Sequence, residues 1–164
     1  AKGFAVTLQS ISAPPDYTDA AQVVKEQLKQ INIDVTVQPL EIGQFAKNNG
    51  VGTFDWQLTG RGMRGDPDGF VHEYHTGTPS FQAWFQGGWS NDTIDKLVDQ
   101  GLATVDQAKR HDIYKQIQTI LLDELPHVPL LVPSKYQVVR GRLKNMYVSY
   151  TDFNTGLREA WVDG

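Results

Sequence analysis

The chain has 164 residues, of which 40% are hydrophobic and 21% charged, a balance typical of one globular domain with a single core. Its formal net charge of −4 argues against a nucleic acid as the main partner, because phosphate backbones attract basic surfaces. The absence of cysteine excludes disulfides, thiolate metal sites and a cysteine nucleophile. No apolar run approaches the roughly 20 residues that a membrane-spanning helix needs. We expect a single domain over residues 1–164.

Residues 4–39 predict a strand, a helix and a second strand. The first strand alternates apolar with polar residues until a proline-rich stretch, 12–16, ends it. Asp16 or Thr18 is placed to cap the helix, and Pro39 closes the second strand. Such a unit predicts parallel strands joined by a right-handed crossover. The residues expected to face inward are Phe4, Val6, Leu8, Ala20, Val23, Val24, Gln27, Leu28, Ile31, Ile33, Val35 and Val37.

The next 35 or so residues predict a short helix, a third strand, a loop and another helix. The short helix covers 40–47, and the stretch 48–52, rich in Asn and Gly, ends it. The third strand covers 54–58 and leads into a loop, after which a helix begins at Phe70. The inward residues of the short helix and the strand are Ile42, Phe45, Ala46, Phe54, Trp56 and Leu58.

The loop over 59–70 is the best candidate for a binding site. Glycines allow a close approach of backbone to ligand, and ligands of α/β sheets bind at loops that leave the carboxyl ends of strands. Its two arginines are able to hold a carboxylate or a phosphate by charge-assisted hydrogen bonds. The alternative is an ordinary solvated connection, in which Asp66 and Asp68 only form a turn and cap a helix. The predicted ligand contacts are Arg61, Gly62, Met63, Arg64 and Asp66.

Residues 76–90 are rich in glycine, proline, serine and aromatic residues, which predicts an irregular segment. Its aromatic side chains are too many to remain exposed without a function or a packing role. Trp84 and Trp89 are predicted to stack against a ligand or to cover the sheet, and packing is the expected role of at least one of them.

Residues 91–125 predict two amphipathic helices. The first begins at Asn91 or Asp92, and the second covers 107–125. Burial of an apolar side chain contributes roughly 1.5–3 kcal/mol before entropy is subtracted, so the second helix is expected to anchor the fold. The inward stripes are Ile94, Leu97, Val98, Gly101 and Leu102 in the first helix and Ile113, Tyr114, Ile117, Ile120, Leu121 and Leu125 in the second.

Beyond Pro126, which stops the second helix, the pattern predicts short strands over 127–132 and 136–139 and a weak strand over 146–148. The succession of strands and helices predicts an α/β fold, with a mostly parallel or mixed sheet flanked by helices.

Patterns typical of catalysis and metal binding are weak. His72 and His75 are three residues apart, whereas a helical metal pair usually lies four apart with a third ligand elsewhere. The chain has no Gly-x-Ser-x-Gly elbow and no complete phosphate or dinucleotide fingerprint. We therefore predict no catalytic residue, no metal site and no cofactor. The alternatives are a small α/β hydrolase or transferase that uses Asp66, His72 or His75, and a protein-interaction module that uses the aromatic segment.

Four segments resemble, in this order, the C-terminal lobe of the extracellular solute-binding proteins of peptide, nickel and related ABC importers. The first segment matches a strand of that lobe that leads into an Asp-Pro turn, and the second matches the start of a helix with the pattern aromatic-x-Asn. The third matches a helix with the order Asp…Arg…Tyr…Gln, and the fourth matches the entry to a strand with the pattern Pro-x-Ile-Pro-Leu. No single segment is specific, but the ordered set covers most of the chain, and residues 4–39 fit the opening of that lobe. The segments are 54–60 with 65–70, then 88–97, then Asp106 with Arg110, Tyr114 and Gln118, then 125–130.

The resemblance implies a two-lobe binding protein that closes on a solute and delivers it to a membrane permease. Its partners would be a small-molecule or peptide solute, the N-terminal lobe of the same protein and an ABC permease, and no nucleic acid. The full-length protein would be periplasmic or extracellular, either with or without a lipid anchor. The chain begins without Met or a signal peptide, so we expect it to be one lobe of a longer protein.

The loop departs from the peptide-binding members at one position. An acidic residue there neutralises the free amino end of a peptide, whereas this chain has Met63 at the corresponding place. Arg61 and Arg64 flank it, and such a pair disfavours an ammonium group and favours an anion. The hypothesis is a ligand that bears a carboxylate or a phosphate.

Overall fold

The structure is a computed structural model of the chain that describes residues 3–60, 65–79, 89–132, 134, 136, 138–147 and 155–163. The chain forms two compact units. Unit 1 comprises residues 1–61 and 72–95, and unit 2 comprises residues 62–71 and 96–164. None of the described helices has the length and hydropathy needed to cross a lipid bilayer.

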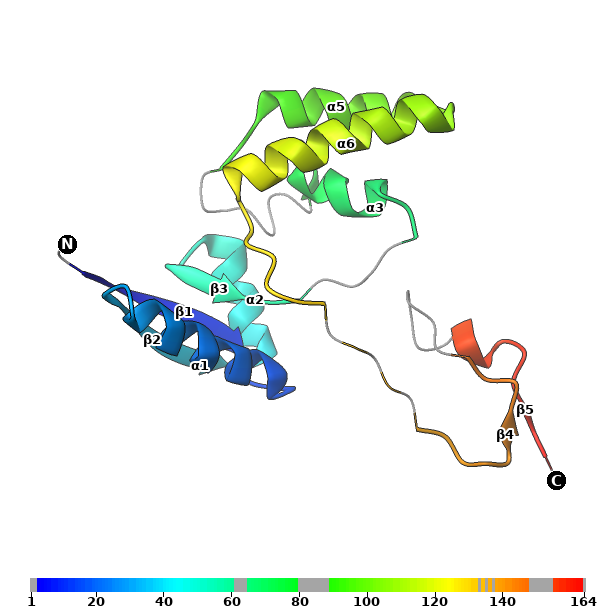
Figure 1. The fold of residues 1–164 in the computed structure, drawn as a ribbon, viewed down its shortest axis with the longest axis horizontal. Coiled ribbons are helices and arrows are strands. Elements are labelled where there is room, and N and C mark those ends of the chain that lie inside the picture. Colours follow the sequence, from blue (N-terminus) through cyan, green and yellow to red (C-terminus); the bar gives the residue numbers. More distant parts are fainter. Residues whose placement is uncertain are drawn as a thin grey trace. The chain divides into compact units, whose positions relative to one another are not determined.

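Unit 1 is built on a three-stranded parallel sheet with the strand order β2-β1-β3 (Figure 1). The central strand β1 (Phe4–Ile11) pairs along its whole length with β2 (Ile33–Leu40). On its other side, β1 pairs through its carboxyl half with β3 (Trp56–Leu58). The predicted parallel strands are confirmed, and β3 is shorter than the predicted 54–58.

Pro39 does not end β2, contrary to the prediction, because β2 is an edge strand. The Leu40 carbonyl accepts a hydrogen bond from the Ser12 N–H at 2.8 Å. Since successive residues of a strand point their backbone groups to opposite sides, the nitrogen of Pro39 faces the free edge, where no ladder hydrogen bond is lost.

The core of unit 1 lies between one face of the sheet and α1 (Asp16–Lys29). Leu8, Ala21 and Val35 are its most deeply buried members, and half-buried side chains from all three strands and from α1 surround them. The predicted stripe of α1 was wrong at Val23 and Ile31, which are 56% and 64% exposed. The prediction held for Val24 and Leu28, which pack against the core, and it missed Ala21, which is fully buried there.

The predicted side-chain cap of α1 was also wrong, because its N-cap position is Pro15 and no side chain bonds there. The Thr18 hydroxyl donates instead to the carbonyl of Ile11 at 3.4 Å. The start of α1 is therefore tied to the end of β1.

The opposite face of the sheet carries a row of glutamines. The register places Gln9 of β1 between Gln38 of β2 and Gln57 of β3. The Gln9 amide donates to Gln38 at 3.2 Å, and its oxygen accepts from Gln57 at 3.1 Å and from Asn48 at 3.3 Å. Asn48 belongs to α2, so this helix meets a polar face of the sheet.

Helix α2 (Ile42–Val51) begins with Glu41, whose carboxylate accepts from the Gly43 N–H at 2.7 Å, and ends at Gly52 with a φ of 68°. Phe45 is buried, as predicted, whereas Ile42 is 61% exposed and Ala46 is exposed, contrary to the prediction. The reason is that α2 lies on the polar face of the sheet, where the Asn48 side chain donates to Gln9. Part of the apolar stripe of α2 therefore remains in solvent.

The loop entry after β3 lies next to the start of α1. A Cβ atom on Gly60 would collide with the hydroxyl of Tyr17 in α1, so only glycine fits there without a shift of that ring. β1 leads into α1, and β3 leads into the loop of interest. Because β1 and β3 are parallel neighbours, both connections start at the same edge of the sheet.

The helix predicted to begin at Phe70 starts at Asp68. It consists of the short α3 (Asp68–Val71), which lies in unit 2, followed by a 3-10 turn η1 (His72–Tyr74) in unit 1.

Helices α5 (Asp92–Ala103) and α6 (Gln107–Glu124) confirm the two predicted amphipathic helices. Asn91 caps α5 by accepting from the N–H groups of Thr93 and Ile94, and Asp106 caps α6 by accepting from the Lys109 N–H at 2.9 Å. The prediction held for Ile94, Leu97, Val98, Tyr114 and Ile117, which are buried, and failed for Leu102 and Leu125, which are 58% and 47% exposed.

The segment after α6 does not form the predicted strands. Among the described residues of 127–132 and 136–139 none is in a strand. Paired strands occur only later, where β4 (Leu143–Lys144) lies antiparallel to β5 (Trp161–Val162), near the 3-10 turn η2 (Thr155–Leu157). Met146 and Tyr147 are not in a strand, and Val148 lies outside the described residues. Alternating apolar residues form a strand only when a neighbouring strand pairs with their backbone groups, and the described residues supply no such neighbour for these segments.

Candidate functional site

The Asp-Pro turn of the candidate loop is formed by Asp66. Its carboxylate oxygen Oδ1 accepts from the Asp68 N–H at 2.8 Å, and its carbonyl accepts from the Gly69 N–H at 3.0 Å. These bonds make an Asx turn that leads into α3. The structure therefore supports the capping role that the sequence suggested for this aspartate.

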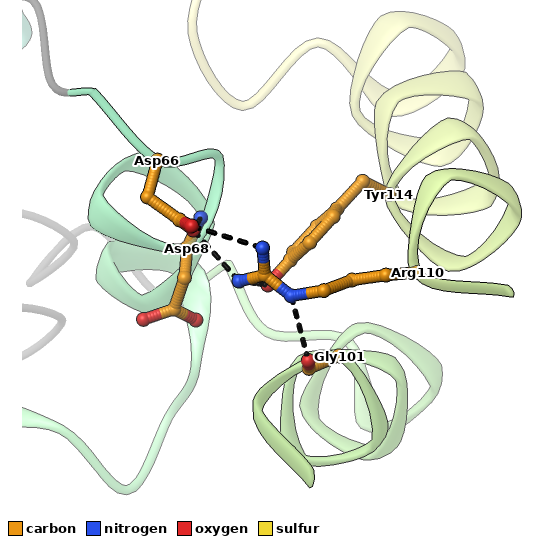
Figure 2. A network of polar contacts seen from close by, with 5 residues as sticks. All are labelled: Asp66, Asp68, Gly101, Arg110 and Tyr114. Carbon is orange, nitrogen blue, oxygen red and sulfur yellow. Dashed lines mark hydrogen bonds and ion pairs between the residues drawn. The ribbon is translucent and has the colours of Figure 1, made fainter. Parts of the chain in front are cut away.

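Arg110 of α6 binds the same carboxylate from a position 44 residues away in the chain. Its Nη1 donates to Asp66 Oδ2 at 2.9 Å, and its Nη2 donates to Oδ1 at 2.7 Å. Two parallel N–H···O bonds between a guanidinium and a carboxylate are the strongest and most directional form of ion pair in proteins. Figure 2 shows the planar group of Arg110 facing the turn.

Arg110 is itself held in place by two neighbours within unit 2. Its Nε donates to the Gly101 carbonyl of α5 at 3.2 Å, and Nη2 also donates to the Tyr114 hydroxyl at 2.8 Å (Figure 2). The guanidinium carbon lies 4.8 Å from the centre of the Tyr114 ring, a cation–π distance. One arginine thus links α5, α6 and the turn before α3.

The electrostatics of this network follow from its contacts. The hydrogen bonds from Arg110, and then the N–H of Asp68, lower the pKa of Asp66 below its ordinary value. The same bonds to Asp66 raise the pKa of Arg110. Burial raises the pKa of Tyr114, so its hydroxyl keeps its proton at neutral pH. The ion pair is therefore charged at neutral pH.

Of the predicted ligand contacts, the structure describes Asp66 and Trp89. Asp66 lies in unit 2, where it forms the ion pair with Arg110. Trp89 lies in unit 1, where its ring packs edge-on against Tyr74, with centroids 6.0 Å apart and planes at 85°. Its predicted ligand contact stays a prediction. The remaining predicted contacts lie outside the described residues: Arg61, Gly62, Met63, Arg64 and Trp84.

Sequence reasoning missed the role of Arg110 and Gly101. Arg110 appeared only as one residue of a helix motif, with no function attached. The available signal was the i, i+4 spacing of Arg110 and Tyr114, which places both on one face of a helix. Gly101 allows the close packing, because a Cβ there would lie 3.0 Å from Cζ of Tyr114.

The segment with the two histidines forms a tight turn. The His75 Nδ1 accepts from the Gly77 N–H at 2.9 Å, and the Thr78 hydroxyl donates to the carbonyl of His72 at 3.0 Å. Asp95 of α5 accepts from the backbone N–H and the hydroxyl of Thr76. Within the described parts of the chain, no three His, Cys, Asp or Glu side chains are grouped as metal ligands would be.

Comparison with known proteins identifies the class. No protein-family model matches the chain. Over 164 residues it is 29% identical to di/tripeptide-binding protein 1 of Pseudomonas aeruginosa, covering 94% of this chain and 30% of that protein. A dipeptide-binding protein of Pseudomonas aeruginosa is 30% identical over 154 residues, covering 91% of this chain and 29% of the relative. The chain thus spans about 30% of the length of these curated relatives.

Solved structures agree in fold. The periplasmic binding protein DppA of Helicobacter pylori in complex with the peptide STSA matches with a TM-score of 0.79 and 23% identity, over 99% of this chain and 32% of that one. A dipeptide-binding protein of a Pseudoalteromonas species in complex with Met-Leu matches with a TM-score of 0.68 and 25% identity, over 76% of this chain and 26% of that one.

The named relatives are peptide-binding proteins, and the fold matches one part of solved peptide-binding proteins, among them an ABC transporter-associated periplasmic binding protein. More particularly, the chain is homologous to dipeptide-binding proteins, which confirms the resemblance to the peptide and nickel family. The relatives named here are binding proteins rather than enzymes. The α/β fold with a parallel sheet is confirmed as well.

Proposed function

We propose that the chain is the C-terminal lobe of a solute-binding protein that delivers peptides or related small solutes to an ABC permease. The observation that carries the proposal is the homology to di- and tripeptide-binding proteins along 91–94% of the chain. In this proposal the complete protein works outside the cytoplasmic membrane, in the periplasm or at the cell surface, with or without a lipid anchor.

The proposed solute contacts follow the end of β3. The loop follows the carboxyl end of this strand, and loops at the carboxyl ends of strands are where ligands of open α/β sheets bind. The braced Asp66 turn supports a binding role for this loop, because binding groups work best on a fixed backbone. The proposed contacts are Arg61, Gly62, Met63, Arg64, Asp66, Trp84 and Trp89.

We also propose that the solute is recognised through an anionic group. Arg61 and Arg64 bracket Met63, so the loop offers two cations and no acidic group between them. A guanidinium pairs with a carboxylate or a phosphate through two parallel hydrogen bonds and repels an ammonium group. In a peptide, this group would be the C-terminal carboxylate.

The partner proposed for the segment after α6 is the N-terminal lobe of the same protein. Among the described residues of this segment, several apolar side chains are exposed: Val132 is 84%, Tyr136 85% and Val138 99% exposed. Exposed apolar groups of this kind mark surfaces that another part of a protein covers. The relatives have further chain that corresponds to such a covering part, because about 70% of their length lies outside the match to this chain.

Calorimetry on the complete protein that carries this chain tests the proposal with three ligands: Gly-Leu, its C-terminal amide and its N-acetyl derivative. The free dipeptide and the N-acetyl derivative are expected to bind, and the amide at least about tenfold more weakly, since it lacks the carboxylate. Arg61→Gln with Arg64→Gln is expected to remove this difference, whereas the control Arg158→Gln, an exposed arginine, keeps it. Equal binding of the dipeptide and its amide would refute anionic recognition. The absence of binding to any peptide in a wider di- and tripeptide panel would refute the peptide assignment.

A further inference from the structure

We infer that Arg110 is a positioning residue for solute binding, and that it acts by fixing the Asp66 turn from α6. The inference rests on the proposed function for the role in binding, but the fixing of the turn is a property of unit 2 alone. Arg110 itself needs no contact with the solute.

The Asp66 carboxylate has little hydrogen-bonding capacity left for a ligand. A carboxylate accepts about four hydrogen bonds through its lone pairs. Three N–H groups already occupy Asp66, two from Arg110 and one from the backbone of Asp68. Its carboxylate is thus used mainly within the protein, and its contribution to binding lies in the position of the turn.

Arg110 is held through most of its hydrogen-bond donors. A guanidinium has five N–H donors in a rigid plane. Four of them are used, two on Asp66, one on the Gly101 carbonyl and one on the Tyr114 hydroxyl. The partners come from the turn before α3, from α5 and from α6 itself, so the plane of Arg110 is held from three sides (Figure 2).

A lysine in place of Arg110 would not hold the turn in the same way. Lysine carries its charge on a single nitrogen and makes no planar, bidentate pair. It would keep the net charge near Asp66 but lose the bonds that set the direction of the turn. Arg110→Lys therefore separates positioning from simple charge neutralisation.

The experiment compares Arg110→Lys, Asp66→Asn and the double variant with the unchanged complete protein. Asp66→Asn keeps an oxygen able to accept from the Asp68 N–H, so the Asx turn survives while the ion pair is lost. Lys115→Gln is the matched control, because Lys115 is an exposed cation on the same helix. Three quantities are measured: the Kd for the best-binding peptide, the urea midpoint, and hydrogen exchange of the amides of residues 69–71.

Each single variant is expected to weaken binding by about tenfold, as displacement of a binding group does, and to speed exchange at residues 69–71. The double variant is expected to weaken binding no more than either single variant, because both remove the same contact. Lys115→Gln is expected to change neither quantity.

Three results would overturn the inference: unchanged exchange at residues 69–71 in Arg110→Lys, a loss of binding no larger than in Lys115→Gln, or a lowered urea midpoint with unchanged Kd. If the unchanged protein bound no peptide, the proposed function would fail. The exchange comparison would then decide by itself whether Arg110 fixes the turn.

Discussion

Gln9 and Gln57 lie 48 positions apart in the chain and share one hydrogen bond, from the amide of Gln57 to the side-chain oxygen of Gln9, at 3.1 Å. The parallel register of β1 and β3 places them opposite each other, and Asn48 of α2 donates to the same oxygen. One amide that is only 6% exposed therefore joins three elements of unit 1.

Replacement of Gln9 by alanine is expected to destabilise the protein by about 1–3 kcal/mol, because the donors of Asn48 and Gln57 lose their shared acceptor in a part-buried site. Urea unfolding measures this difference. Gln38→Ala, in the exposed glutamine of the same row, is the matched control and is expected to cost less. An equal or larger loss in Gln38→Ala would show that Gln9 is not the centre of the row.

Two helical glycines are expected to respond in opposite ways to alanine. At Gly50 of α2 a Cβ would meet no atom within 4 Å, so Gly50→Ala is expected to stabilise the protein by up to about 1 kcal/mol through helix propensity. At Gly101 a Cβ would lie 3.0–3.1 Å from the ring and hydroxyl of Tyr114. Gly101→Ala is therefore expected to destabilise by about 1–3 kcal/mol, because the ring must move.

Thermal or urea unfolding of both alanine variants tests this contrast. Stabilisation by Gly101→Ala as large as that by Gly50→Ala would mean that the Tyr114 ring yields without cost. The packing argument for Gly101 would then be wrong.

The Asp66–Arg110 pair makes stability depend on pH in a defined direction. The pKa of Asp66 is lower in the folded protein than its ordinary value of 3.8. Its stabilising contribution is therefore fully present above pH 3.8 and is lost as the pH falls through the folded pKa, where the carboxylate takes up a proton.

The free energy of unfolding of Asp66→Asn is expected to lie below that of the unchanged protein by a constant amount between pH 5 and 7, roughly one unit or more above that ordinary pKa. The gap is expected to shrink below pH 3.8. Chemical denaturation of both proteins over this range measures it. A gap that widens on acidification would contradict the assigned direction of the pKa.

Short-range patterns in the sequence were sufficient for much of the fold. The alternation in residues 4–39 predicted the parallel βαβ unit, because period-2 and helical patterns report local structure directly. The predicted helix starts, at Asn91 or Asp92 and at residue 107, were equally local, since the caps that the structure shows at Asn91 and Asp106 bond only to residues two or three positions away.

The sequence by itself thus determined the parallel strands β1 to β3 and the helices α1, α2, α5 and α6, and through the ordered motifs it determined the resemblance to solute-binding proteins, but it predicted strands after α6 that the structure does not form. Only the tertiary structure decided that α1 buries Ala21 and exposes Val23, because periodicity does not say what packs against a stripe. It also decided that Arg110 meets Asp66 across 44 positions. A contact between distant residues depends on how α6 and the turn are brought together, and no local pattern encodes that distance.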